Sequence, residues 1–270
     1  MDSGDLERTR LAFDAAAPVY DALNEDLPGI RRMRAVTSQL SLEYFPPAGR
    51  ILEINCGTGN DAFFLAERGR HVVATDISPA MIEEVRKKAA RVSGGGSITP
   101  RECSFTSLHE MHETAFDGAL SNLGGLNCTD QLPMVAAELA ALLKPGATFI
   151  AAVMPPFCLW ETLASIARMK WGSAFRRMRA GGTLAHVHGE NVRTFYYSPR
   201  TFQRMFSPQF SPVVTLGLAI VTPPPNSTAA WERAGKVIQR MKRLDDAIAP
   251  LPLLRSIGDH FVTVLRRNRP

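Results

Sequence analysis

The sequence predicts an α/β protein whose central sheet is largely parallel. From residue 50 to residue 153, short apolar segments rich in β-branched residues alternate with segments of helical length. Glycine and proline separate the segments, as at Gly69 and at Pro145-Gly146. Because parallel strands need a crossover connection, this alternation is typical of consecutive βαβ units.

The elements of this region follow in a regular order. We expect strands at 50–54, 71–75, 98–103, 116–121 and 148–153, and helices at 61–68, 79–92 and 131–143. Ahead of the first strand, apolar residues at helical spacing predict two helices, within 5–24 and 30–44. Pro46-Pro47-Ala48-Gly49 then breaks the chain.

The regular alternation of strands and helices ends at Pro155-Pro156. A basic helical segment runs to Gly181-Gly182, and it is followed by an expected strand at 192–197, a helix at 199–206, a strand at 213–221, a basic helix at 231–248 and a terminal strand at 260–265. We therefore divide the chain into N-terminal helices (1–45), a core (46–154), a mainly helical cap (155–210), and final core strands with a helical insertion (211–270).

Composition narrows the class of protein. No run approaches 18 apolar residues, the first ten residues lack the apolar core of a signal peptide, and four cysteines show no metal-ligand spacing. These features predict a cytoplasmic protein with no metal site. The net charge is +5, and residues 161–243 hold thirteen Lys or Arg against three acids. Such asymmetry fits an anionic substrate, a membrane surface, nucleic acid or a solvated basic face.

A glycine turn follows the first strand. Glu53 closes that strand, Cys56-Gly57-Thr58-Gly59 forms the turn, and Asp76 closes the next strand. Glycine lets backbone N–H groups approach a ligand closely, and an acid at the second position can accept hydrogen bonds from a ribose diol. By itself the turn also fits the GxGxxA fingerprint of dinucleotide-binding proteins.

The surroundings of the turn distinguish these alternatives. Residues 51–59 and 73–81 closely resemble the first two motifs of class I S-adenosylmethionine-dependent methyltransferases. Residues 116–122 resemble the fourth strand of that family, and 142–146 resemble the turn before its fifth. Phe13-Asp14 and Tyr20-Asp21 resemble the N-terminal lid of the branch that contains the ubiquinone and menaquinone methyltransferases.

The resemblance implies a Rossmann-like seven-stranded class I methyltransferase sheet with S-adenosylmethionine as cofactor. It implies that Glu53 steadies the loop or meets the methionine ammonium through water, and that Asp76 holds the ribose hydroxyls. The remaining cofactor residues implied by position are Gly57 and Gly59 in the loop, Ile77, Met81, Ser104 and Phe105 around the adenine, Asn122 and Leu123 at the methionine end, and Tyr20 in the lid.

Two positions depart from the family pattern. Asn55 stands where the family has its first glycine, and asparagine is the residue that best tolerates a left-handed backbone after glycine. We therefore keep Asn55 in the cofactor loop. Ser104 stands where the family has an acid at the adenine amino group, and a serine hydroxyl is the weaker hydrogen-bond acceptor.

Candidate residues on the acceptor side come from the cap. His186 and His188 alternate on an extended stretch before Tyr196-Tyr197, and either histidine is a candidate general base. Tyr197 is the third candidate catalytic residue. Methyl transfer from a sulfonium can also proceed by positioning alone, because the donor is already activated. The basic, aromatic segment 168–179 fits an entrance for an apolar or anionic acceptor, contact with a membrane surface, or an ordinary cap helix.

We expect methyl transfer to a small, partly apolar acceptor by in-line displacement. The alternatives are a nicotinamide-dependent oxidoreductase and a non-catalytic cofactor-binding or scaffold protein. Nucleic acid is disfavoured as a partner, because Ser121-Asn122-Leu123-Gly124 stands where a base-flipping motif would follow the fourth strand. The identity of the acceptor, the atom that is methylated and the oligomeric state stay open at this point.

Overall fold

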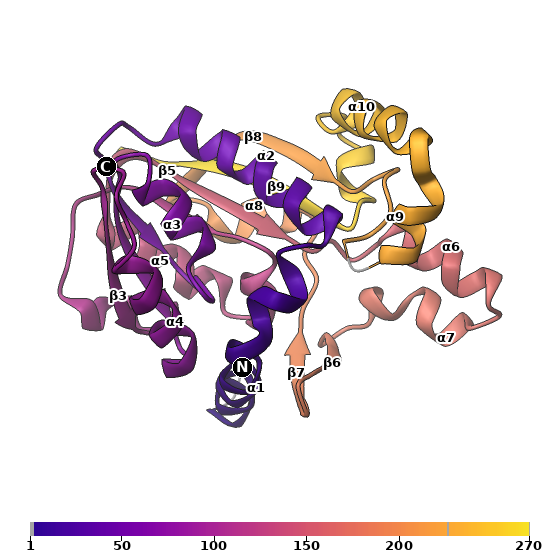
Figure 1. Ribbon diagram of the computed structural model, residues 1–270, viewed down its shortest axis with the longest axis horizontal. Helices are drawn as coiled ribbons and strands as arrows, with labels where there is room; N and C mark the ends of the chain where they lie inside the picture. Colours follow the sequence, from indigo (N-terminus) through magenta and orange to yellow (C-terminus); the bar gives the residue numbers. More distant parts are fainter. Residues whose placement is uncertain (1–2, 226, 270) are drawn as a thin grey trace.

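The computed structural model describes residues 3–225 and 227–269. A seven-stranded sheet forms its centre, in the order β3-β2-β1-β4-β5-β9-β8 (Figure 1). Its strands are β1 (Arg50–Glu53), β2 (His71–Asp76), β3 (Ser97–Glu102), β4 (Phe116–Ser121), β5 (Leu143–Val153), β8 (Phe210–Leu218) and β9 (His260–Arg267). The first five pair in parallel, and β9 is antiparallel to both β5 and β8. The expected Rossmann-like fold is confirmed.

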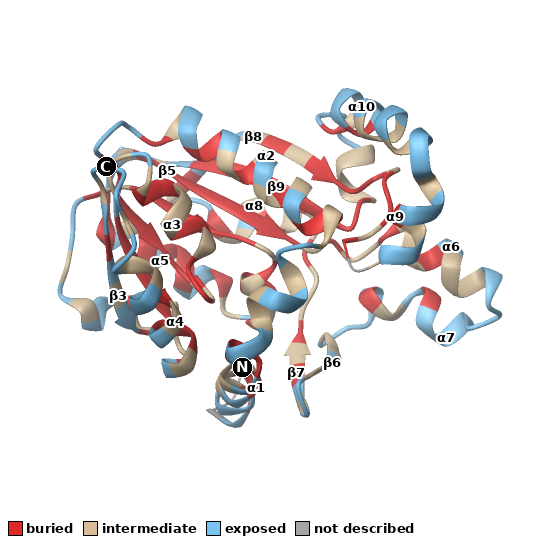
Figure 2. Cartoon of the chain, viewed as in Figure 1, coloured by how far each residue is buried: buried red, intermediate tan, exposed pale blue. Residues whose placement is uncertain are grey.

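Helices cover both faces of the sheet. One face carries α2 (Pro28–Tyr44), α3 (Asn60–Ala66) and α4 (Pro79–Ala89), and the other carries α5 (Leu132–Leu142) and α8 (Pro199–Phe206). Side chains alternate between the two faces along each strand, so Ile150 packs in one core cluster and Phe149 in the other. Both clusters are buried, whereas the outer helix faces are exposed (Figure 2).

The N-terminal helix α1 (Ser3–Asn24) lies apart from the main helix layers. It contacts α4 on one side and the hairpin β6–β7 on the other (Figure 1). Among the described residues, none of the helices combines the length and apolarity needed to cross a membrane.

The expected, mainly helical cap also contains a β-hairpin. It contains α6 (Leu159–Ala167) and α7 (Trp171–Ala174), but then forms a two-stranded sheet of β6 (Thr183–Val187) and β7 (Glu190–Thr194). The turn residues His188 and Gly189 have φ angles of 43° and 92°. Two consecutive positive φ angles are typical of the tight turns that join two-residue hairpins.

Two boundaries also differ from expectation. β5 begins at Leu143, because Leu143 pairs with Phe116 across an irregularity in the ladder before regular pairing starts at Thr148. The expected helix 231–248 is divided into α9 (Thr228–Ala234) and α10 (Ile238–Ile248). Gly235, with a φ of 46°, ends the first of these two helices.

Candidate functional site

A cavity of about 290 Å³ lies where β1, β2 and β4 end. β1 and β4 are neighbours in the sheet although β2 and β3 separate them in sequence, so the strand order reverses here. Ligands of open α/β sheets bind at this kind of switch point. Ten of the twelve expected cofactor residues line the cavity: Tyr20, Glu53, Asn55, Gly57, Asp76, Ile77, Met81, Phe105, Asn122 and Leu123.

Gly59 and Ser104 do not line the cavity. Gly59 has a φ of 77° and lies so close to α4 that a Cβ there would come within 3.0 Å of Val85. Gly59 therefore allows the loop to pack closely against α4. The Ser104 hydroxyl lies 2.8 Å from that of Thr106 and accepts a hydrogen bond from the Thr106 N–H. The Ser104 side chain therefore stabilises a turn and does not line the cavity.

Asn55 joins two loops of the cavity wall. Its φ of 48° is left-handed, as expected for a residue in the place of a glycine. Its Oδ1 accepts a 2.8 Å hydrogen bond from the Ser121 hydroxyl at the end of β4. Its amide covers Gly125, where a Cβ would come within 2.1 Å of the Asn55 Nδ2.

These contacts give opposite expectations for two substitutions of Asn55. Asn55→Val should lower the free energy of unfolding by about 1–3 kcal/mol, because a β-branched residue is strained at positive φ. Asn55→Gly relieves backbone strain but loses the Ser121 hydrogen bond, worth about 1 kcal/mol, so we expect little net change. Urea unfolding measures both, and equal losses for the two variants would contradict the role of the left-handed backbone.

Asp76 is buried at the end of β2 and faces the cavity. Its two carboxylate oxygens accept hydrogen bonds from the N–H groups of Gly57 (2.9 Å) and Ser78 (3.0 Å). Burial raises the pKa of Asp76, and these backbone donors oppose that shift. The glycine loop thus fixes the carboxylate, which keeps lone pairs for hydroxyl donors of a ligand.

Glu53 is the most unusual group in the cavity wall. Its carboxyl is buried, and within the described part of the chain its Oε2 has no hydrogen-bond partner. Burial, followed by the neighbouring Asp61 carboxylate, raises the pKa of Glu53 well above its usual range. A buried carboxyl in this state calls for a proton or a cation.

Arg34 and Asp61 are two site residues that the sequence analysis missed. They form an ion pair, and both line the cavity. The Asn122 side-chain amide donates a 3.0 Å hydrogen bond to Asp61, which connects the pair to the end of β4. Burial would lower the pKa of Arg34, but the Asp61 carboxylate outweighs it and the pKa is raised. The guanidinium is therefore a fixed positive charge beside Glu53.

Helix α1 is bound over the cavity by two acids. Asp14 accepts hydrogen bonds from the Ser78 hydroxyl (2.6 Å) and the Ala80 N–H (3.3 Å) at the start of α4. Asp21 accepts a hydrogen bond from the Thr58 hydroxyl (2.6 Å) in the glycine loop and forms an ion pair with Lys88 (2.6 Å). Phe13 and Tyr20, on the same helix, line the cavity.

The candidate catalytic residues are placed elsewhere. His186 is exposed and lies outside the cavity lining, and its Nδ1 lies 3.4 Å from the Asn191 Oδ1. His188 is exposed at the hairpin tip. On β6, Ala185 and Val187 face the cavity instead, because alternate residues of a strand point to opposite sides. The structure therefore does not place either imidazole among the residues that line the cavity.

Tyr197 is likewise a structural residue. It is buried in the core, and its hydroxyl donates a hydrogen bond to the Thr129 carbonyl. Burial raises its pKa. The adjacent Tyr196 lines the cavity, with the Arg177 guanidinium 5.4 Å from the centre of its ring. The structure therefore places Tyr196, and not the expected Tyr197, in the lining of the cavity.

Buried ion pairs attach the cap to β9. Arg177 bonds to Glu161 on α6 (2.7 Å) and to Asp259 (2.7 Å). Asp259 also contacts the Nδ1 of His260 at 2.8 Å, and His260 and Arg177 hold the pKa of Asp259 well below its usual range against the effect of burial. Arg176 pairs with Glu161 as well and reaches the cavity lining.

Comparison with known proteins finds similarity to methyltransferases. Residues 51–146 match a family described as a methyltransferase domain. The demethylmenaquinone methyltransferase of Symbiobacterium thermophilum is 30% identical over 145 residues, which are 52% of this chain and 57% of that protein. These matches, each over part of the chain, support its resemblance to the class I S-adenosylmethionine-dependent methyltransferases.

Other sequence relatives fall within the same family. The malonyl-[acyl-carrier protein] O-methyltransferase of Halorhodospira halophila is 28% identical over 228 residues, covering 76% of this chain and 72% of that protein. The chain spans little more than half the length of the quinone-type relatives it matches, 57% and 58% for two of them. These relatives support the expected quinone methyltransferase branch and give the oxidoreductase alternative no support.

Solved structures share the fold at low sequence identity. The N-methyltransferase NodS of Bradyrhizobium japonicum, in complex with S-adenosylhomocysteine, has a TM-score of 0.60 at 14% identity and covers 97% of this chain and 100% of its own. The [4+2]-cyclase SpnF has a TM-score of 0.63 at 13% identity, covering 97% and 96%. Since one of these two proteins is named as a cyclase, the reaction must be argued from the site.

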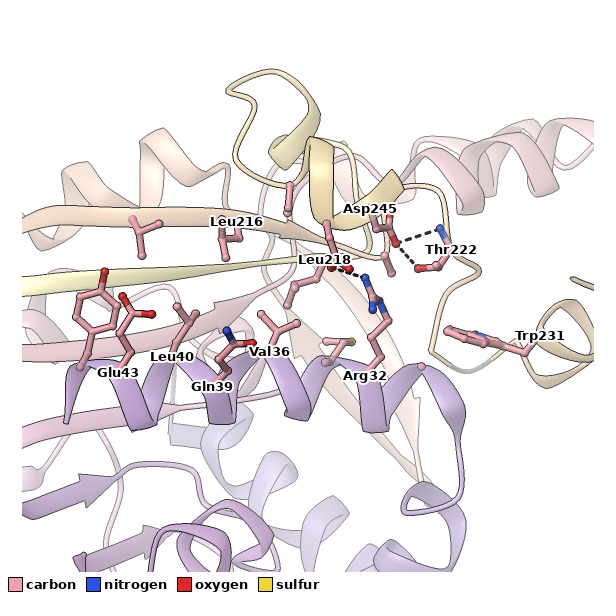
Figure 3. A pocket seen from close by; sticks show the side chains of 18 residues that line it. Arg32, Val36, Gln39, Leu40, Glu43, Leu216, Leu218, Thr222, Trp231 and Asp245 are labelled. Carbon is pink, nitrogen blue, oxygen red and sulfur yellow. Dashed lines mark hydrogen bonds and ion pairs between the residues drawn. The ribbon is translucent and has the colours of Figure 1, made fainter. Parts of the chain in front are cut away.

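The chain has a second, larger cavity of about 410 Å³ between α2 and β8 (Figure 3). Two of the acids that line it are already partnered: Asp245 accepts hydrogen bonds from Thr222 and the Val221 N–H, and Asp246 pairs with Arg32 at 2.7 Å. This cavity lacks the glycine loop and contains none of the unpartnered buried carboxyl atoms of the described residues. It does not meet the requirements of the cofactor.

No metal cluster accompanies the cavity. Within residues 3–225 and 227–269, no three His, Cys, Asp or Glu side chains are grouped so that they could hold a metal ion.

Proposed function

We propose that this chain binds S-adenosylmethionine in the 290 Å³ cavity and transfers its methyl group to a small, partly apolar acceptor. The observation that carries the proposal is the buried, unpartnered Oε2 of Glu53 within a wall that also presents Arg34 and Asp76. An amino-acid zwitterion joined to a ribose has a positive, a negative and a hydroxyl-bearing part, which match these three groups.

The charged end of the cofactor matches one end of the cavity. Glu53 would accept a hydrogen bond from the methionine ammonium, and Arg34 would pair with the methionine carboxylate. Asp76 would accept hydrogen bonds from the ribose hydroxyls, while Gly57 leaves room for the close approach because it has no Cβ. Ile77 and Met81 would flank the adenine.

Residues 1–45 would serve as the lid. Because Asp14 and Asp21 attach α1 to α4 and to the glycine loop, Phe13 and Tyr20 would cover the bound cofactor and exclude water. When bound, the cofactor supplies a methyl group already activated on a sulfonium. The chain then has to hold the acceptor in line with that group in a dry site, and good positioning contributes much of the rate.

The cap, residues 155–210, would bind the acceptor. Half of the cap residues that line the cavity are apolar: Ala185 and Val187 from β6 and Val192 from β7. Tyr196 and Arg176 add a hydroxyl and a positive charge to that wall. The combination fits an acceptor with an apolar body and a polar or anionic end. With no imidazole in the lining, positioning rather than a histidine base is the favoured mechanism.

The state of Glu53 leads to a pH prediction. Without a cation beside it, the raised pKa of Glu53 keeps the carboxyl protonated at a pH where an ordinary glutamate is ionised. The cofactor ammonium stabilises the ionised form of Glu53, so cofactor binding should release a proton from this residue. The affinity for the cofactor should therefore fall by up to about tenfold for each pH unit below the raised pKa of Glu53.

Calorimetry measures this proton release directly. Titration of S-adenosylhomocysteine in buffers with different ionisation enthalpies, between about pH 5 and 7, should give different apparent enthalpies. Glu53→Gln cannot ionise, so its buffer dependence should disappear. The same buffer dependence in both proteins would show that Glu53 is not the group that responds to the ligand.

Product formation separates methyl transfer from cofactor binding alone. Incubation with S-adenosylmethionine and a panel of quinols, phenols and carboxylates should yield S-adenosylhomocysteine with at least one acceptor. Tight binding of S-adenosylhomocysteine without turnover across the panel would instead support the cofactor-binding scaffold.

A further inference from the structure

The cap exposes an unusual number of large apolar side chains. Of the sixteen that are exposed among the described residues, six lie between residues 163 and 184. They are Leu163 (56% exposed), Met169 (80%), Trp171 (63%), Phe175 (48%), Met178 (61%) and Leu184 (58%). We call these six residues the cap patch. A concentration of exposed apolar side chains marks a site of interaction.

The charge around the cap patch has one sign. Residues 162–189 contain no Asp or Glu, and they contain five Lys or Arg. Three of these cations are exposed next to cap-patch residues: Arg168, Lys170 and Arg179. Such a surface is complementary to an anionic layer with an apolar interior beneath it.

The fold presents the cap patch outward. Helices α6 and α7 fully bury only Thr162 and Ala174, and their other residues are half-buried in α6 or exposed, as most of α7 is (Figure 2). Polar contacts attach this part of the cap instead, through the Glu161, Arg177 and Asp259 ion pairs. The two helices lie at the end of the molecule remote from β3, where a flat surface can reach them (Figure 1).

The cap patch adjoins the wall of the proposed active site. Arg176 lines the cavity, and the next exposed residues on either side of it in the chain are Phe175 and Met178. On β6, Leu184 is exposed while its neighbour Ala185 faces the cavity. An apolar acceptor dissolved in a bilayer would therefore meet the cap patch and the cavity wall together.

We propose that the cap patch docks on the surface of an anionic lipid bilayer, from which the chain takes a lipid-soluble acceptor. Docking itself is independent of catalysis, whereas the delivery of the acceptor rests on the proposed function. An acidic protein would also attract the three cations. The bilayer is favoured because the six exposed apolar residues outnumber those cations and include tryptophan, which prefers the headgroup region.

Vesicle binding tests the proposal without cofactor or acceptor. The full chain should co-sediment with vesicles of phosphatidylcholine mixed with phosphatidylglycerol, and only weakly with phosphatidylcholine alone. Added salt should weaken binding, because it screens the headgroup charge. Failure to bind the anionic vesicles at low salt would overturn the proposal while leaving the methyltransferase function intact.

Tryptophan fluorescence reports whether the cap patch enters the bilayer. Trp171 is exposed, whereas Trp231 is buried and Trp160 donates a hydrogen bond to the Val221 carbonyl. Binding should shift the emission to shorter wavelength, and brominated lipids should quench it. In Trp171→Phe the shift should disappear while most of the binding is kept. An unchanged shift in that variant would contradict insertion at this site.

Paired substitutions distinguish the cap patch from the rest of the surface. Met169→Ser with Trp171→Ser should weaken vesicle binding at least about tenfold, because membrane affinity scales with buried apolar area. The matched control, Leu23→Ser with Met134→Ser, removes apolar side chains that are 55% and 47% exposed elsewhere and should leave binding unchanged. Equal loss in the two pairs would overturn the proposal. Tight binding to an acidic acyl-carrier protein without any binding to vesicles would also overturn it.

Discussion

Arg177→Met should lower the free energy of unfolding by about 3 kcal/mol and release the cap from the sheet. Removing one partner of a buried ion pair typically costs 3–5 kcal/mol, because the other charge stays buried. We expect a loss near the lower limit of this range, because Asp259 still contacts His260 and Glu161 still forms an ion pair with Arg176. Urea unfolding gives the global effect, and limited trypsin digestion reports the opening of the cap.

Arg179→Met is the control for this experiment. Arg179 lies two residues away but is exposed, with one hydrogen bond to the Gly172 carbonyl at 3.1 Å. Its loss should change stability by less than about 0.5 kcal/mol. If Arg177→Met resembles Arg179→Met in both stability and rate of cleavage, the buried ion pairs are not what holds the cap.

Asp76→Ala should raise the Kd for S-adenosylhomocysteine about ten- to several-hundred-fold. A hydrogen bond to a charged group contributes roughly 1.5–3 kcal/mol, and one or two such bonds to the ribose would be lost. The variant also leaves the N–H groups of Gly57 and Ser78 without their acceptor, so the free energy of unfolding should fall by about 1–3 kcal/mol. Calorimetry at a temperature where the variant is folded separates the two effects.

Ser104→Ala is the matched comparison for Asp76→Ala. Because the Ser104 hydroxyl contacts Thr106 and does not line the cavity, its removal should leave the Kd within about twofold. A large loss of affinity in Ser104→Ala would restore this serine to the adenine site. An unchanged Kd in Asp76→Ala would contradict the placement of the ribose.

The sheet and the cofactor side of the cavity could be predicted because local signals agree there. Strand-length apolar runs, glycine turns and acids at strand ends fix both the element and the direction in which its last residue points. Asn55 is the clearest case, since its expected left-handed backbone is what the structure contains, at a φ of 48°. Its bond to Ser121 depends on the neighbouring strand, and no local pattern shows it.

The acceptor side could not be predicted because it depends on tertiary placement. The hairpin β6–β7 turns at His188, so alternation directs Ala185 and Val187 into the cavity and His186 outward. Tyr196 and Tyr197 are adjacent, and only the path of the chain after β7 decides which of them is buried. Arg34 lies on a helix that precedes the glycine loop in sequence, and no local sequence pattern predicts its ion pair with Asp61.

The central claim is that the cavity at the glycine loop holds the cofactor, and a crystal structure with S-adenosylhomocysteine tests it most directly. The account predicts that the ligand ammonium lies within hydrogen-bond distance of the Glu53 carboxyl, with the ribose at Asp76 and the sulfur open toward Tyr196. A ligand in the second cavity between α2 and β8, or one whose ammonium points away from Glu53, would contradict the account.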